Sequence, residues 1–140
     1  MKKPDFHMVP MTGSAGGVAF TLKTFLRANL SVGFDFIARL SGLEKKIKKS
    51  SLIITGEGFL DAQTLLGKGV YKLAKLAQSY KREVIVFCGS YDKTINWKRY
   101  NINYIVKIRP VNYRLLQSLR NARLLLKSAV KANINLFSKC

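Results

Sequence analysis

The feature that most constrains the fold of this chain is the alternation of short apolar, β-branched runs with longer amphipathic segments. The runs predict strands at 51–55, 83–88 and 103–108. The connections between them are too long for hairpins and long enough for crossover helices, which join strands in parallel. The sequence therefore predicts an α/β fold with three layers, in which a mainly parallel sheet lies between flanking helices. The run at 51–55 is uninterrupted, as is typical of a buried strand.

Amphipathic patterning predicts the helices around this sheet. The first helix is expected to begin at a glycine-rich turn near residue 16. Further helices are expected at 34–41, 69–80 and 112–136. Residues 56–69, which follow the first strand, are predicted to form a loop, because the segment carries four glycines. Residues 1–11 are predicted as an irregular lead-in and 12–140 as the α/β region.

Composition excludes several classes of protein. Hydrophobic residues make up 48% of the chain, so we do not expect wholesale disorder. No segment approaches the roughly 20 apolar residues of a membrane helix, and the first residues lack the apolar core of a secretory signal. Cys88 and Cys140 form no paired motif, which argues against a disulfide scaffold or a zinc site and suits the reducing cytoplasm.

The net charge of +18 raises the question of an anionic partner. Residues 93–140 contain no acidic residue, and the only dense basic cluster is the short run at 45–49. Lysines outnumber arginines, and Asn and Ile are common, as is typical of proteins from AT-rich genomes. We favour this compositional origin and do not expect nucleic acid as a partner. A basic α/β module that binds nucleic acid without catalysis stays the alternative.

A glycine-rich turn, with Gly13, Ser14, Gly16 and Gly17, precedes the first predicted helix. Glycines let a ligand approach the backbone, and the start of a helix offers unpaired N–H groups and the positive end of its dipole. This turn is therefore a candidate site for an anion or a phosphate. The alternative is a glycine-rich turn that only lets the helix pack tightly.

A second candidate site follows the first predicted strand. Glu57 and Asp61 are two of only seven acidic residues, and Gln63 and Lys68 follow them. Ligands of parallel α/β sheets bind beyond the carboxyl ends of the strands, where these residues are expected. Carboxylates there can bind Mg²⁺ or accept a hydroxyl proton, and Lys68 can meet a phosphate. The alternative is that both acids cap backbone N–H groups in a turn.

Single positions exclude some familiar catalytic motifs. Ala62 stands where a P-loop before Gly67 and Lys68 needs its first glycine. Asp61 stands where a dinucleotide-binding turn needs its third glycine. His7 is the only histidine and lies in the lead-in, so Ser-His-Asp machinery is excluded.

Three linked blocks resemble the bacterial glycerate kinase family. Thr12-Gly-Ser-Ala-Gly-Gly17 is similar to its Gly-Ala-Gly-Ala-Ala-Gly-Gly segment. The block from Leu52 to Thr64, followed by Gly67-Lys68, resembles Ile-Thr-Gly-Glu-Gly-Arg-Leu-Asp-x-Gln-Thr…Gly-Lys. Val84-Ile-Val-Phe-Cys-Gly-Ser90 is similar to the strand and turn that come next. The resemblance covers only the C-terminal third of a two-domain α/β enzyme.

The resemblance implies phosphorylation of D-glycerate to phosphoglycerate with ATP and Mg²⁺. It implies catalytic roles for Glu57 and Asp61, and substrate or phosphate binding by Gln63, Lys68 and the glycine turn; no metal ligand is assigned. Phe59 stands where the family has Arg, which removes a bidentate partner for an anion. The chain is thus expected to be a fragment, a split subunit that needs an N-terminal partner polypeptide or a second copy, or a pseudoenzyme subunit.

Overall fold

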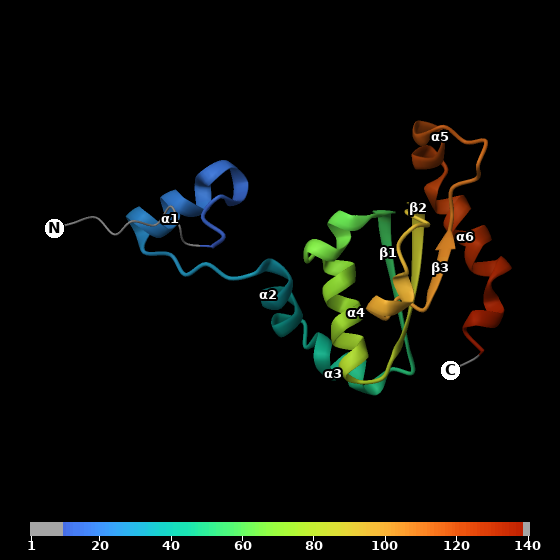
Figure 1. Ribbon diagram of the computed structural model, residues 1–140, viewed down its shortest axis with the longest axis horizontal. Helices are drawn as coiled ribbons and strands as arrows, with labels where there is room; N and C mark the ends of the chain where they lie inside the picture. Colours follow the sequence, from blue (N-terminus) through green and yellow to red (C-terminus); the bar gives the residue numbers. More distant parts are fainter. Residues whose placement is uncertain (1–9, 139–140) are drawn as a thin grey trace. The chain divides into compact units, whose positions relative to one another are not determined.

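The computed structural model describes residues 10–138 of the chain (Figure 1). Most of the predicted lead-in, with His7, and also Cys140 lie outside the described residues. Contacts within the chain divide it into two compact units at the boundary between Ser41 and Gly42. The two units are described separately below.

The first unit contains two helices that follow the glycine-rich turn. A short 3-10 helix, η1 (Ser14–Gly17), leads into α1 (Val18–Leu26), and α2 (Gly33–Leu40) follows. The helices predicted near residue 16 and at 34–41 are therefore present. Neither α1 nor α2 buries a side chain. The first unit consequently has little hydrophobic core of its own.

The second unit contains a parallel sheet with the strand order β1-β2-β3. Its strands are β1 (Leu52–Leu60), β2 (Glu83–Tyr91) and β3 (Tyr104–Lys107). Its helices are α3 (Leu43–Lys49), α4 (Gly69–Ser79), α5 (Leu115–Arg120) and α6 (Ala122–Ala132), with 3-10 helices η2 (Ala62–Leu66), η3 (Trp97–Tyr100) and η4 (Ile134–Leu136). The predicted parallel α/β sheet is confirmed.

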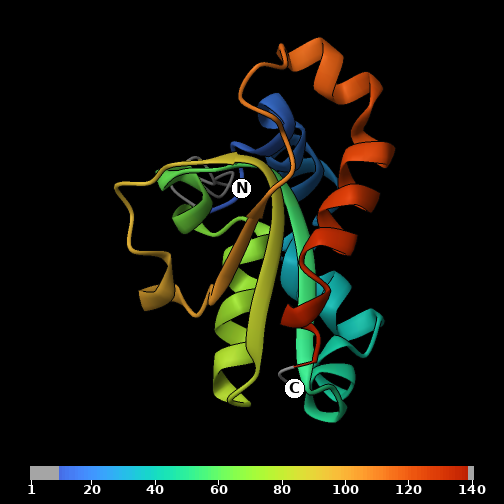
Figure 2. The ribbon, with the colours of Figure 1, turned by 90° about the vertical axis from the view of Figure 1, so that its right-hand side faces the viewer.

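Helices cover both faces of this sheet, which gives the predicted three layers (Figures 1 and 2). On one face, residues of α3 and α4 pack with Trp97 against the β-strands in the main core. On the other face, Ala129 and Val130 of α6 pack with Phe137 against a smaller cluster. That cluster is centred on three buried side chains: Ile85, Phe87 and Val106. None of the helices within residues 10–138 has the length and apolarity needed to cross a membrane.

The prediction that β1 ends at Gly56 is wrong, and so is the predicted loop from there. The strand continues to Leu60, and Glu57 and Phe59 pair with Cys88 and Ser90 of β2. Glycines permit this continuation instead of ending it, because a Cβ on Gly89 would lie 2.7 Å from the carbonyl oxygen of Gly58. The two strand ends therefore approach more closely than side chains would allow.

Two predictions about helices also need correction. The segment predicted as one helix at 112–136 is broken at Asn121, which ends α5 and precedes α6. The Asn121 amide donates a 2.8 Å hydrogen bond to the carbonyl oxygen of Gln117, in competition with regular helical bonding. The lysine run at 45–49 does not follow a helix but lies within α3, whose lysines are exposed and whose Ile47 is buried.

Candidate functional site

The acidic segment forms a hydrogen-bonded turn at the carboxyl end of β1. Asp61 precedes η2, and its Oδ1 accepts a 3.0 Å hydrogen bond from the backbone N–H of Thr64. The Thr64 hydroxyl is 3.2 Å from the backbone nitrogen of Asp61 and accepts its N–H in return. These reciprocal bonds form a capping box. Asp61 is thus held in one position by the buried Thr64, as the capping alternative predicts.

The same turn brings Lys68 to Asp61. The Lys68 Nζ lies 3.7 Å from Asp61 Oδ1, and both side chains are partly exposed. An ion pair of this kind contributes roughly 0–1 kcal/mol, so it does little for stability. It does hold an ammonium and a carboxylate together beyond the carboxyl end of a parallel strand, where ligands of such sheets bind.

Glu57 and Gln63 lie in the same segment but make fewer contacts. Glu57 belongs to β1, and its Oε1 accepts a 3.1 Å bond from the N–H of Gly58. Gln63 is exposed on η2. The structure therefore joins Asp61 directly to Lys68 and places Glu57 in the adjoining strand.

Asp92 is an acidic residue at this edge that the sequence analysis did not select. Its backbone N–H donates a 2.8 Å bond to the carbonyl oxygen of Leu60, which ties the end of β2 to the residue before Asp61. Hydrogen bonds from the hydroxyl and then the backbone N–H of Thr94 lower the pKa of Asp92. The signal for it was available: Asp92 follows the second buried strand, as Asp61 follows the first.

The glycine turn lies in the first unit, so the structure does not join its residues to the acidic segment. Ala15, Gly16 and Gly17 all have positive φ angles, of 53°, 65° and 93°. Glycine adopts this region without strain, whereas Ala15 does so at a cost. The carbonyl oxygen of Thr12 accepts the N–H of Phe20 at 3.1 Å and ties the start of the turn to α1.

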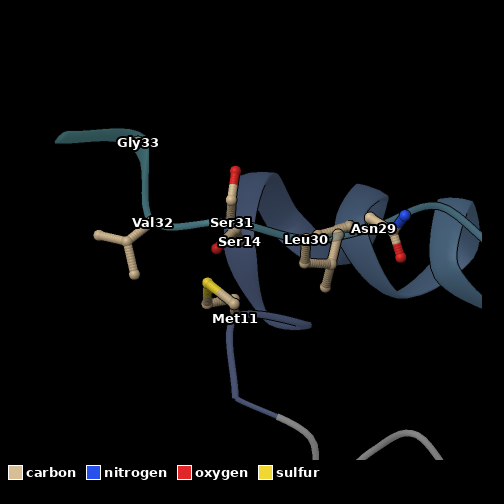
Figure 3. Close-up of a pocket in the computed structure, with 8 residues that line it drawn as sticks. Met11, Ser14, Asn29, Leu30, Ser31, Val32 and Gly33 are labelled. Atoms are coloured by element: carbon tan, nitrogen blue, oxygen red, sulfur yellow. The ribbon is translucent and has the colours of Figure 1, made fainter. Parts of the chain in front are cut away.

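A pocket of about 480 Å³ lies beside this turn (Figure 3). Met11 and Ser14 border it, and the segment 29–33 runs past them. Ser14 is the only one of the four predicted turn residues among its lining residues. Its lining, completed by Ala19, carries no charged side chain, so an anion would have to be bound by backbone N–H groups and by the neutral donors of Ser14, Asn29 and Ser31.

The donor groups of the described residues limit the metals that could bind. Residues 10–138 contain no cluster of three or more His, Cys, Asp or Glu side chains able to hold a metal ion. A cation that needs a cage of protein ligands, such as structural Zn²⁺, does not fit. Mg²⁺ is different, because one or two carboxylates suffice when phosphates and water supply its other ligands.

Cys88 lies opposite Glu57 in the β1–β2 register, yet it is no candidate nucleophile. Burial raises the pKa of the Cys88 thiol to about 11, although the Lys107 ammonium favours the thiolate. The thiol is therefore neutral near pH 8. We expect Cys88 to resist iodoacetamide at that pH in the folded chain and to react after unfolding, as peptide mass spectrometry would show. Rapid labelling of Cys88 in the folded chain would contradict its burial.

Comparison with known proteins places the chain in a family. The model of the glycerate kinase family matches residues 1–138. The chain is 39% identical over 84 residues to glycerate kinase of Bacillus subtilis, covering 60% of this chain and 22% of the relative. It is 34% identical over 116 residues to glycerate kinase of Neisseria meningitidis, covering 82% of this chain and 31% of the relative.

A solved structure agrees with these relatives. The crystal structure of a protein assigned as glycerate kinase 2 from Salmonella typhimurium superimposes with a TM-score of 0.63 at 27% identity. The superposition covers 91% of this chain and 33% of that one. The chain belongs to the glycerate kinase family. It spans between about a fifth and a third of the relatives that it matches.

Proposed function

We propose that the chain supplies the C-terminal part of a glycerate kinase, which transfers the γ-phosphoryl group of ATP to D-glycerate in the cytoplasm. The observation that carries this proposal is the family match over residues 1–138. The ion pair of Asp61 and Lys68, at the edge where ligands bind to parallel sheets, supports it. Because the chain spans 22% of the Bacillus subtilis enzyme, we expect activity to need a polypeptide that supplies the rest.

The acidic turn is proposed to handle the phosphates and the acceptor hydroxyl. Glu57 and Asp61 each use one carboxylate oxygen in local hydrogen bonds, so their other oxygens can meet a ligand. These two side chains would hold Mg²⁺ that arrives with ATP, and the ion would offset negative charge on the phosphates. Lys68 would contact a phosphate oxygen, and Gln63 would donate a hydrogen bond to the substrate. Either carboxylate can take the hydroxyl proton as the acceptor attacks.

The glycine turn is proposed to bind the second anionic group, either a phosphate or the carboxylate of glycerate. Gly13, Ser14, Gly16 and Gly17 lie directly before α1, where backbone N–H groups and the helix dipole favour negative charge. Among these residues, Ser14 also offers a hydroxyl to the adjoining pocket.

Anion binding by this turn can be tested separately from catalysis. We expect titration with sulfate or phosphate to shift the amide NMR signals of residues 13–18 at lower concentration than those of the lysine run at 45–49. The reason is that a fixed set of N–H groups binds an anion more tightly than mobile, solvated lysines do. A response of the lysine run without any response of the turn would contradict the proposal.

The proposed reaction itself is tested by measuring ATP-dependent phosphorylation of D-glycerate by the chain alone and in the presence of the missing part of the enzyme. Turnover that needs both polypeptides is the expected result. A pair that assembles but shows no turnover would assign the chain to a pseudoenzyme.

A further inference from the structure

The position of β1 in the sheet disagrees with its sequence. An uninterrupted apolar run such as Leu52-Ile53-Ile54 is typical of a parallel strand that is covered on both faces. Within the described residues, β1 pairs with β2 on one side and with no strand on the other. Ile53 is buried, but Ile54 is 54% exposed. The sequence of an interior strand thus occupies the edge of the sheet.

The free edge of β1 also lacks the usual protection against pairing. Exposed edge strands are commonly short, or carry lysine, proline or a covering element, because their unpaired N–H and C=O groups bind other strands. β1 has nine residues and contains neither lysine nor proline, and its one charged side chain, Glu57, is partly buried and accepts the N–H of Gly58. Its free edge is therefore well suited to accept a further strand.

Helix α6 packs on the face of the sheet that carries the smaller cluster, and it extends past the edge of the sheet at β1 (Figure 2). Leu126, Ala129 and Val130 lie on one stripe of α6, since they are three and four residues apart. Ala129 and Val130 pack against the sheet, but Leu126 is 42% exposed. Figure 2 shows the C-terminal end of α6 over the sheet and its N-terminal half extending past β1. A strand added beside β1 would lie below this half of the helix.

We infer that β1 is an interior strand of the assembled enzyme and that its free edge pairs with a strand from the polypeptide that supplies the rest of the glycerate kinase fold. The relatives carry that polypeptide in the same chain, since this chain matches only 22% of one and 31% of another. The added strand would cover Ile54 and give Leu126 an apolar surface to pack on. The inference rests on the part of the proposed function in which a second polypeptide completes the fold.

The test is co-expression of this chain with a tagged portion of the Bacillus subtilis enzyme, namely the part that precedes its matched segment. We expect the two to co-purify as a 1:1 complex. Within the complex, amide hydrogen exchange at alternate residues of β1 should slow by about tenfold or more, because those N–H groups gain partners. Failure to form a complex, or a complex without added protection of β1, would overturn the inference.

Variants locate the contact independently. Ile54→Lys and Leu126→Lys should each weaken the complex by about tenfold or more, because an unpaired lysine would be buried. Gln78→Lys adds the same charge on the exposed side of α4 and should bind normally. Equal binding by all three variants would overturn the inference. Dimers of this chain alone would also overturn it if they protected the β1 amides from hydrogen exchange as strongly as the complex does. The readout is binding, so a protected complex without turnover would overturn only the proposed function.

Discussion

The chain alone is expected to phosphorylate no D-glycerate above background, and the complex with the missing part of the enzyme is expected to do so with ATP. Phosphoryl transfer needs the nucleotide, the metal and the acceptor hydroxyl to be held in line. The described residues offer one acidic turn with a lysine and, in a separate unit, one glycine turn. Phe59 stands where the resembled family has Arg, so the chain lacks one candidate partner for developing phosphoryl charge.

In the active complex, Asp61→Asn is expected to lower kcat/KM by about 100-fold or more, which is the usual range for loss of an acid or base. The substitution removes the negative charge but keeps an oxygen that can accept the N–H of Thr64. The turn should therefore keep its shape, and the thermal midpoint should change little. Glu57→Gln is expected to behave in the same way, because the amide oxygen can still accept the N–H of Gly58.

The matched control is Thr64→Val, which breaks the capping box and leaves the Asp61 carboxylate charged. It should cost about 1 kcal/mol of stability, as loss of a helix cap does. Full activity of both carboxamide variants would mean that the carboxylates only cap the turn, a role that the amide oxygens can also fill. Robust turnover by the 140-residue chain alone would contradict the need for a second polypeptide.

The periodicity of the sequence was sufficient to predict the parallel sheet, because each buried strand is a contiguous apolar run. The ends of the strands and helices were harder to predict from the sequence, because they depend on contacts between segments that are distant in the chain. Gly56 normally signals the end of a strand, yet here β1 continues since Gly58 and Gly89 allow the two strand ends to approach. Likewise, the apolar stripe of the last segment gave no sign of the break at Asn121, which depends on a local side-chain bond.

The site was predicted in part. Two acids near the end of a buried strand were enough to select the turn, and the structure adds that Asp61 is fixed by Thr64 and paired with Lys68. No sequence pattern could show that the N–H of Asp92 bonds to the residue before Asp61. The division into two units also has no local signal, because it depends on which helices find a core. For that reason the glycine turn and the acidic turn are proposed as two separate binding sites.

Gly89→Ala is expected to destabilise the sheet by about 2–3 kcal/mol, at the upper end of the cost of overpacking. The added Cβ would lie 2.7 Å from the carbonyl oxygen of Gly58, so the backbones of β1 and β2 would have to move apart. Denaturant unfolding followed by Trp97 fluorescence measures the effect, since Trp97 is the sole tryptophan and is buried in the main core.

Gly58→Ala is the matched control, because a Cβ on Gly58 meets no atom within 4 Å. The free energy of unfolding should change by less than about 1 kcal/mol, and in the stabilising direction if the unfolded chain loses freedom. Equal stability of the two variants would mean that the strands can separate at this end without cost.

The difference between Gly89→Ala and Gly58→Ala also concerns the candidate site. The bond from Asp92 to Leu60 lies just beyond the Gly58–Gly89 contact, so strands forced apart there would move Asp61 relative to Asp92. Gly89→Ala should therefore lower activity in the complex even at temperatures where the variant stays folded.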